Sequence, residues 1–474
     1  MRVLFVSSEV ASLAKTGGLA DVALALPKAL HELGVDVAVV MPKYRAVQGK
    51  ADMEEVARFS VPIAGESKEC IAFRGVLPDS EVPIYFLGHD SYFDRPELYG
   101  EGSEYEDALE RFSFFSRASL ELCRAIEWTP DVIHANDWHA SLIPAYLRDG
   151  VVPQLANVKT LLTIHNLGYQ GVSPWSKASV TGLSQESLEP YHLGNQINLL
   201  KGGILGVDLI NAVSPTYARE ILAEGAGLEQ ELRSREDALF GVINGVDVDA
   251  WNPTKDQHLW EAFSADNLAG KVEDKMQLQQ ELGLDVDASV PLFSAISRLA
   301  EQKGFDILMD AFDRMMDTGI QFVLLGTGAA EYEKFFKSAQ ERYPGRVASL
   351  ITFSEQWAHR IEGSTDGFLM PSHYEPCGLN QQYSLRYGTI PLVRATGGLK
   401  DTVFELDIEA DTGNGFLFEE KTADAFMAMI ERAVKVYNEQ PEAWKRMMIR
   451  GMREDLSWTS SAKKYVELYD RLLG

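Results

Sequence analysis

The chain has 474 residues, 46% of them hydrophobic and 24% charged, which is ordinary for a globular protein of about two to four domains. Asp and Glu outnumber Lys and Arg by 70 to 44, and the net charge of −26 disfavours binding to nucleic acid or to anionic membranes. The three widely spaced cysteines, Cys70, Cys123 and Cys377, form no CxxC pair, so neither a disulfide framework nor a thiolate zinc site is predicted.

The N-terminal segment predicts a core strand. Residues 3–6 (VLFV) are hydrophobic and lack the features of a signal peptide. No run of about 18 uncharged apolar residues is present, so we expect no transmembrane helix. We therefore expect a cytoplasmic protein, and the sequence carries no signal of its oligomeric state.

A six-residue phrase occurs twice, as TGGLAD at 16–21 and as TGGLKD at 396–401. Each copy follows a strand-like run and precedes a helical pattern. A glycine pair at such a turn exposes backbone N–H groups, and the helix N-terminus behind it favours negative charge. Two ordinary tight turns are the alternative. The repetition favours two α/β domains that each present an anion-binding loop.

Short β-rich runs alternate with helical patterns along the chain. This alternation predicts parallel sheets covered by helices on both faces, with ligands at the carboxyl ends of the strands. In the first helix, Pro27 predicts a kink or a restart. The predicted strands are residues 35–40, 82–87, 132–133, 160–164, 209–213, 293–296, 321–325, 349–353, 367–370 and 390–393.

A domain boundary is expected after residues 243–247 (INGVD), because the turn-rich segment 249–254 (DAWNPT) breaks the alternation. Asp247 and Asp249 have the DxD spacing of a metal–nucleotide motif, but their place in a linker favours a turn. The last segment, 457–473, has helical spacing.

Two polar segments in the first half each end a predicted strand: 134–139 (HANDWH) and 163–166 (TIHN). Three histidines and an aspartate would suit a metal ion, but no HExxH-type spacing accompanies them. Polar hydrogen-bonding residues at the mouth of a sheet are the simpler interpretation.

Cations stand out in the second half of this acidic chain. Arg298 and Lys303 follow a predicted strand; a guanidinium can bind two phosphate oxygens, and an ammonium supplies a mobile point charge. The alternative is an exposed loop with two solvated cations. Gly326 and Gly328 form a GxG after the next strand, which is weak evidence for a phosphate loop.

Glu375 follows another predicted strand, where a catalytic or sugar-binding carboxylate would be placed, and Pro376 stiffens its loop. Cys377 is interpreted as a small packed thiol rather than as a nucleophile.

Taken together, these segments resemble bacterial glycogen synthases and the related plastid starch synthases. The resemblance runs from residue 1 to the C-terminal helix, with the motifs in the family's order. It implies the GT-B architecture, an α/β fold in which two Rossmann-like domains with parallel sheets face a deep interdomain cleft. It assigns residues 1–243 to an acceptor-side domain, 244–456 to a donor-side domain, and 457–474 to a helix that crosses back to the first domain. The matching segments are 15–21, 134–139, 244–247, 251–253, 297–299, 375–379 and 396–401.

The resemblance implies transfer of glucose from ADP-glucose to the 4-hydroxyl at the non-reducing end of an α-1,4-glucan such as glycogen, with retention of configuration. No cofactor or metal is expected beyond the donor substrate, and no nucleic acid or membrane partner.

The same resemblance implies the roles of individual residues. Arg298 and Lys303 would hold the diphosphate, Glu375 and His165 would grip the donor glucose, and Asp137 would lie near the acceptor. Glu375 would position and stabilise rather than act as a nucleophile. The expected ADP-glucose contacts are Lys15, Gly17, Gly18, Asp21, Asn244, Gly326, Gly328, Cys377, Gly378, Leu379, Thr396, Gly397, Gly398 and Leu399.

The chain departs from the family pattern at Asn136, usually His, and at His373 and Tyr374, usually Arg and Phe. Losing a cation there would weaken donor binding or alter acceptor preference. Three alternatives stay open: a GT-B transferase that uses UDP-glucose or another sugar nucleotide, a pyridoxal-phosphate-dependent phosphorylase, and a catalytically silent glucan-binding protein.

Overall fold

The computed structural model describes all 474 residues, and the chain divides into two compact units. Unit 1 comprises residues 1–244 and 458–474, and unit 2 comprises residues 245–457. Each division lies one residue beyond the boundary expected from the sequence. None of the helices combines the length and the apolar character needed to span a membrane.

Unit 1 is built on a nine-stranded sheet of order β12-β11-β7-β6-β1-β2-β5-β4-β3. β4 pairs antiparallel with β3 and β5, whereas the other neighbours are parallel. β8 (Val172–Pro174), β10 (Gln196–Asn198) and β9 (His192–Leu193) form a small antiparallel sheet. The strands of the large sheet are β1 (Arg2–Val6), β2 (Asp36–Pro42), β3 (Glu54–Ile63), β4 (Glu66–Val76), β5 (Pro83–Gly88), β6 (Val132–Asn136), β7 (Lys159–Ile164), β11 (Leu209–Ala212) and β12 (Leu239–Gly241).

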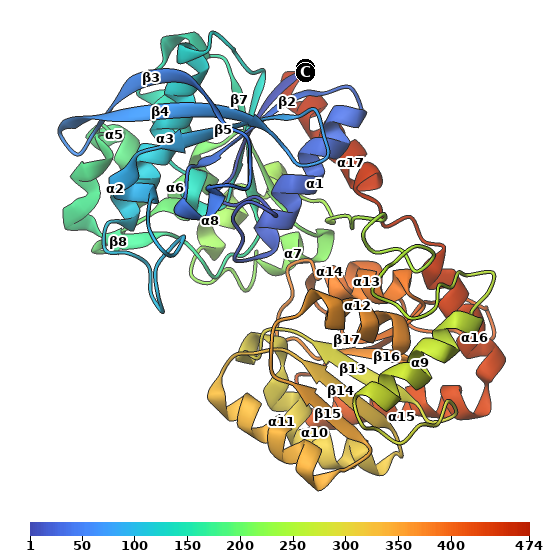
Figure 1. Ribbon diagram of the computed structural model, residues 1–474. Helices are drawn as coiled ribbons and strands as arrows, with labels where there is room; N and C mark the ends of the chain where they lie inside the picture. The colour runs from blue at the N-terminus through green and yellow to red at the C-terminus, as the bar shows by residue number, and fades with distance from the viewer. The chain divides into compact units, whose positions relative to one another are not determined.

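The C-terminal helix belongs to unit 1 and lies beside the first helix of the chain (Figure 1). Within it, the hydroxyl of Tyr469 lies 2.8 Å from Nδ1 of His134, and the hydroxyl of Tyr465 accepts a hydrogen bond from Asn211 at 3.0 Å. These buried contacts tie the helix to β6 and β11. The helices of unit 1 are α1 (Gly18–Glu32), α2 (Asp90–Phe93), α3 (Ala108–Ala125), α4 (Ile143–Arg148), α5 (Gln185–Leu188), α6 (Leu199–Gly206), α7 (Pro215–Glu220), α8 (Glu229–Ser234) and α17 (Trp458–Leu473).

Unit 2 is a six-stranded parallel sheet of order β15-β14-β13-β16-β17-β18 with helices on both faces (Figure 1). Its strands are β13 (Leu292–Ile296), β14 (Gln321–Leu325), β15 (Val347–Leu350), β16 (Gly367–Met370), β17 (Ile390–Arg394) and β18 (Phe416–Phe418). Its helices are α9 (Ala269–Glu281), α10 (Phe305–Asp317), α11 (Ala330–Arg342), α12 (Glu355–Ser364), α13 (Asn380–Arg386), α14 (Gly397–Thr402), α15 (Ala423–Glu439) and α16 (Pro441–Met452).

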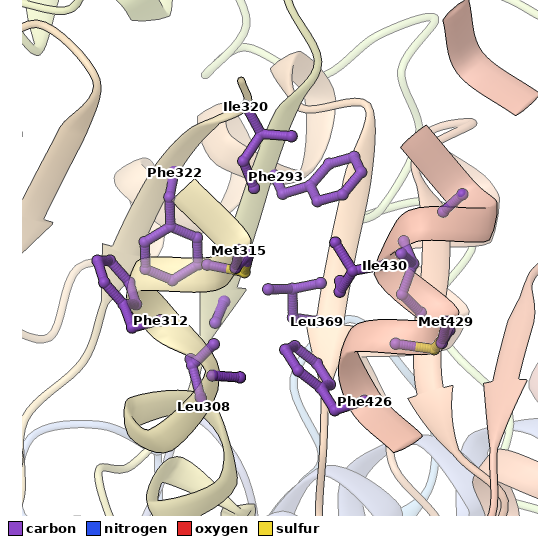
Figure 2. Packing of buried hydrophobic residues seen from close by; sticks show 14 of the residues in the cluster. Phe293, Leu308, Phe312, Met315, Ile320, Phe322, Leu369, Phe426, Met429 and Ile430 are labelled. Carbon is purple, nitrogen blue, oxygen red and sulfur yellow. The ribbon is translucent and has the colours of Figure 1, made fainter. Parts of the chain in front are cut away.

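Side chains that alternate along the unit 2 strands pack into two hydrophobic cores, one on each face of the sheet. Phe293 and Phe322 pack with α10 and α15, and Figure 2 shows them among Phe312, Met315 and residues of α15. Val323, from the other side of β14, packs instead with α9 and α12. The continuous apolar runs in these strands reflect burial on both faces.

Three expectations about the fold are wrong in detail. α1 runs unbroken through Pro27, so the helix does not restart there, because proline removes only one helical N–H bond and this stretch of the helix is buried; a kink at Pro27 stays a prediction. The strand expected at 349–353 ends at Leu350, and Phe353 beyond it is 90% exposed. The sheet of unit 1 is mixed, because the long β3–β4 hairpin extends one edge of it.

In each unit, one strand lies where the strand order reverses. β1 lies between β2 and β6, and β13 lies between β14 and β16. In open α/β sheets, ligands bind outside the carboxyl ends of the strands at this position. The residues after β1 and β6, and after β13 and β16, are therefore the candidate site residues of the two units.

Candidate active site

The first glycine loop, residues 15–18, is held by a buried carboxylate. Glu9 is 4% exposed and accepts hydrogen bonds from the backbone N–H groups of Thr16 at 2.6 Å and Gly17 at 3.1 Å. The hydroxyls of Thr16 and Tyr99 donate to it at 2.5 and 2.7 Å. Two of the amides expected to be available to an anion are therefore occupied. Sequence reasoning missed Glu9, although a carboxylate between a strand and a glycine loop was a signal.

The outer side of this loop is open. A Cβ atom added to Gly17 or Gly18 would meet no other atom within 4 Å. Lys15 Nζ lies 2.6 Å from Oδ1 of Asp21, and the Lys15 side chain is 49% exposed. Lys15, Gly17 and Gly18 of this loop thus lie together with Asp21 of α1, and the space beside the two glycines is open.

Asp137, directly after β6, has a strained backbone with φ 54° and ψ −173°. Such a conformation costs a non-glycine residue about 1–3 kcal/mol and occurs mainly at functional sites. Its Oδ1 accepts the backbone N–H of His165 at 2.7 Å. Burial raises the pKa of the Asp137 carboxyl to about 7.

His165 follows β7 and is joined to the end of β6 through its ring as well as its backbone. Its Nε2 lies 2.9 Å from Oδ1 of Asn136, which is fully buried. Burial lowers the pKa of the His165 imidazole to about 3, so the ring is neutral at physiological pH. The structure thus brings together two predicted residues, Asp137 and His165, and Asn136 contacts the His165 ring.

The other two histidines of this region are structural. His134 contacts the hydroxyls of Tyr469 and Thr163 at 2.8 and 2.7 Å. His139 stacks on Trp138, with ring centroids 4.0 Å apart. Burial lowers the pKa of both imidazoles well below the ordinary value. No group of three or more His, Cys, Asp or Glu side chains is arranged to hold a metal ion.

In unit 2, the predicted catalytic residues meet at the carboxyl ends of β13 and β16. Lys303 Nζ lies 2.7 Å from Oε2 of Glu375, which also accepts the hydroxyl of Ser372 at 3.1 Å. Glu375 is 5% exposed. Arg298, by contrast, is exposed, and its guanidinium forms no hydrogen bond or ion pair, although its carbonyl oxygen accepts the hydroxyl of Ser297 at 3.2 Å. One cation is thus held against a buried carboxylate while the other remains available to a ligand.

The GxG after β14 is explained by backbone packing. A Cβ atom on Gly326 would lie 1.9 Å from the Ser297 carbonyl oxygen, and one on Gly328 would lie 2.1 Å from that of Leu299. The N–H of Gly328 donates to Glu333 at 3.1 Å. These glycines hold the loop that carries Arg298, and their contact with a ligand remains a prediction.

The second glycine loop packs directly on the segment that carries Glu375. The N–H of Gly398 donates to the Glu375 carbonyl oxygen at 3.1 Å. Gly397 has φ +46°, and a Cβ there would lie 1.9 Å from that same oxygen. A Cβ on Gly398 would lie 2.0 Å from the Cys377 carbonyl oxygen. Cys377 is buried, as expected of a packed thiol.

Four of the remaining predicted residues lie in the segments that form this junction, and Asn244 does not. Gly378 has a left-handed φ of +72° and leads into α13. Leu379 immediately precedes that helix, Leu399 is fully buried in α14, and Thr396 precedes α14 and is 3% exposed. Asn244 is buried and belongs to unit 1, far along the sequence from the cluster at residues 375–399.

The departure at His373 has a structural explanation. Its Nε2 lies 2.8 Å from Oδ1 of Asp306 on α10, and its carbonyl oxygen accepts a hydrogen bond from Arg394 at 2.5 Å. His373 therefore anchors the loop that carries Glu375. The buried cation Arg394 also binds this loop, through the carbonyl oxygens of Ser372 and His373. Tyr374 is 37% exposed.

Two family models match the chain. Residues 2–234 match the starch synthase catalytic domain, and residues 278–448 match glycosyl transferases group 1. The chain is 44% identical to the glycogen synthase of Syntrophotalea carbinolica, covering 99% of this chain and 98% of that protein. It is 43% identical to the glycogen synthase of Thermotoga maritima, covering 100% and 99%.

Solved structures share the fold over the whole length. The catalytic domain of starch synthase IV from Arabidopsis thaliana, bound to ADP and acarbose, matches with a TM-score of 0.90 at 35% identity and 99% coverage of both chains. Sucrose-phosphate synthase from Thermosynechococcus elongatus matches with a TM-score of 0.63 at 19% identity, covering 100% of this chain and 99% of that one, which is a likeness of fold alone. The expected GT-B class, with two Rossmann-like α/β units, is confirmed. The chain belongs to the glycogen synthase family of glycosyltransferases.

Proposed function

We propose that this chain elongates glycogen by transferring glucose from ADP-glucose to the non-reducing 4-hydroxyl of an α-1,4-glucan, with retention of configuration. The curated relatives of matching length are glycogen synthases, and the similar starch synthase structure holds ADP. The observation that carries the proposal is the unit 2 cluster, in which Lys303 contacts buried Glu375 and Arg298 remains unpaired.

In this proposal, the cations stabilise the departing ADP. Negative charge develops on the β-phosphate as the glycosidic bond breaks, and donors fixed in advance lower the barrier for that step. Arg298 binds the diphosphate through its exposed guanidinium. Lys303 contributes its charge from a position already set by Glu375. No metal is needed in this scheme, so we propose that transfer is metal-independent and requires no cofactor.

Glu375 acts on the sugar rather than on the phosphates. Lys303 and Ser372 both bind Oε2, so Oε1 is left for a donor hydroxyl or for the positive charge of an oxocarbenium-like transition state. Since its partner is an ammonium, Glu375 is suited to positioning and electrostatic support. The leaving phosphate oxygen then accepts the proton of the attacking hydroxyl.

The acceptor and the base are contacted by other groups. Asp137 and His165 lie together at the sheet edge of unit 1, and we assign Asp137 to the acceptor side and His165 to the donor sugar. Phe353, just beyond β15, is 90% exposed, and a nucleobase can stack on its aromatic ring. We propose that the protein acts in the cytoplasm.

The direct test is incorporation of labelled glucose into glycogen from ADP-glucose and UDP-glucose in parallel, with EDTA present. Strong transfer from ADP-glucose that survives chelation is expected. Transfer only from UDP-glucose would change the donor, and transfer to a different acceptor class would overturn the assignment.

A matched pair of arginines tests the phosphate role. Arg298→Ala is expected to lower kcat by about 10²–10³-fold with folding intact, because its guanidinium supports no other residue. Arg314→Ala on α10, which removes a surface pair with Asp424 on α15, should leave turnover unchanged. Equal activity of both variants would contradict the phosphate role.

A further inference from the structure

The contact between Asn136 and His165 joins the ends of two neighbouring strands. Asn136 is the last residue of β6 and is fully buried, and His165 directly follows β7. Asn136 Oδ1 lies 2.9 Å from Nε2 of the His165 ring. An amide oxygen and a ring nitrogen share one hydrogen atom here, so the orientation of the amide decides where that hydrogen lies.

The orientation of the Asn136 amide is set by the backbone. Its Nδ2 donates to the carbonyl oxygen of Val6 at 3.1 Å and to that of His134 at 3.3 Å. Carbonyl oxygens only accept hydrogen bonds, so they require the NH₂ group on that side. A flipped amide would lose both of these hydrogen bonds and place Oδ1 against two carbonyl oxygens with no hydrogen atom between them.

The fixed amide in turn sets the protonation of the imidazole. Because Oδ1 of Asn136 can only accept, Nε2 of His165 must carry the hydrogen. In the neutral ring, Nδ1 is then an acceptor, and no protein group donates to it. Burial holds the pKa near 3, and the nearby His134 and His139 are themselves kept neutral by burial, so the ring keeps this form at neutral pH.

The backbone fixes the position of the same residue. The N–H of His165 donates to Oδ1 of Asp137 at 2.7 Å, and Asp137 is held in its strained conformation by its own N–H bond to the Thr163 carbonyl oxygen at 2.9 Å. Consecutive residues of the β6 terminus therefore hold the ring and the backbone of His165. This arrangement leaves the ring one free function, which is to accept a hydrogen bond at Nδ1.

We propose that Asn136 is a positioning residue that holds His165 as the Nε2–H tautomer, so that Nδ1 accepts a hydrogen bond from a hydroxyl of the donor sugar. The contact between Nδ1 and the donor sugar rests on the proposed function, whereas the effect of Asn136 on the tautomer does not. A hydroxyl that donates to His165 keeps its oxygen lone pairs for other partners, and the site selects a sugar with a hydroxyl at that position over its deoxy analogue. Asn136, where the family usually has His, thus has a specific role, which is to fix the tautomer of His165.

The test is the tautomer itself, measured by ¹⁵N NMR of histidine-labelled protein, with the His165 signals assigned from their loss in His165→Gln. Wild-type protein should show a protonated Nε2 and a bare Nδ1 from pH 7 down to pH 5. A protonated Nδ1 in the wild-type spectrum overturns the proposal, and this measurement requires no variant at position 136.

Asn136→Ala supplies the functional arm. It should allow the Nδ1–H tautomer and lower kcat/KM for the donor by about tenfold, the size expected for one lost hydrogen bond. Asn211→Ala is the matched control, because Asn211 is another fully buried asparagine of the same sheet that bonds Thr163, Tyr465 and Val242 but not His165. It should leave the His165 tautomer unchanged.

The two parts of the proposal fail separately. An unchanged tautomer in Asn136→Ala would show that Asn136 does not set it. Full activity of His165→Ala would remove the donor contact from the proposed function, whereas the tautomer result would still stand.

Discussion

The same six-residue phrase forms two loops that are held in opposite ways. In unit 1, the amides of Thr16 and Gly17 are bound by a side chain, the carboxylate of Glu9. In unit 2, the amide of Gly398 is bound by a backbone group, the carbonyl of Glu375. The glycines of the first loop face open space, whereas those of the second are required by backbone packing. Glycines at equivalent turns thus leave open space beside the loop in one unit and allow close backbone packing in the other.

The largest expected effect comes from breaking the packing of the second loop. Gly398→Ala would place a Cβ atom 2.0 Å from the rigid Cys377 carbonyl oxygen, so we expect a loss of about 3 kcal/mol or more of stability and loss of activity. Gly18→Ala at the equivalent position should fold normally, because nothing lies within 4 Å. Chemical unfolding and turnover of the two variants measure this difference. Equal stabilities of the two variants would contradict the difference in packing between the two loops. If Gly18→Ala keeps the wild-type stability but turns over more slowly, a ligand lies against the first loop.

The next largest effect is a loss of turnover that leaves the structure of the second loop unchanged. Lys303→Ala should lower kcat by about 10²–10³-fold, because it removes a fixed cation from the site. The loop should keep its structure, since it depends on the backbone of Glu375 rather than on its side chain. Crystal structures or circular dichroism of the variant, with Lys337→Ala on α11 as a surface control, check both points. Displacement of residues 396–401 in Lys303→Ala would show that the side chains do hold this loop.

A smaller effect is expected where a side chain does hold the loop. Glu9→Gln replaces one carboxylate oxygen by an NH₂ group that faces donors, and should cost about 1–3 kcal/mol of stability. The first loop should loosen, so KM for ADP-glucose should rise more than kcat falls. Hydrogen exchange at residues 15–18, together with steady-state kinetics, measures this. Glu375→Gln is the contrasting variant, which should lower kcat while amide exchange in the second loop stays slow.

The smallest effect is a pH dependence that arises in unit 1, at His165. The folded pKa of His165, about 3, lies below the ordinary value of 6.5, so the unfolded chain binds a proton that the folded ring does not. The contribution to stability is present above pH 6.5 and is lost as the pH falls toward 3. Between pH 6.5 and 5, wild-type stability should fall by about 1 kcal/mol per pH unit more than that of His165→Gln. Parallel urea titrations at several pH values measure the difference, and identical slopes would contradict it.

The expectations that succeeded from sequence are those with a local physical cause. Alternating β and α patterns predicted two α/β units, because strands buried on both faces need continuous apolar runs. Glu375, Lys303 and Arg298 follow strands β13 and β16, and parallel topology brings strand ends to one edge of the sheet. Their assembly at one edge could therefore be anticipated, although their roles in catalysis remain predictions.

The expectations that failed depended on packing. Pro27 lies in an unbroken helix because the buried face of α1 outweighs one missing hydrogen bond. The long β3–β4 hairpin was missed because its half-exposed strands lack a continuous apolar run. Glu9 was missed because its partners include Tyr99, ninety positions away in the chain.

The sequence by itself determined the family, the two-unit α/β class and the edge of each sheet where the site residues gather, since these follow from local pattern and strand order. Only the tertiary structure decided which groups are engaged. It assigned Glu9 to one glycine loop and the Glu375 carbonyl to the other, paired Lys303 and left Arg298 free, and oriented the Asn136 amide toward His165. The reason is physical: hydrogen bonds and desolvation depend on groups that meet only after the chain folds, and sequence spacing does not encode those meetings.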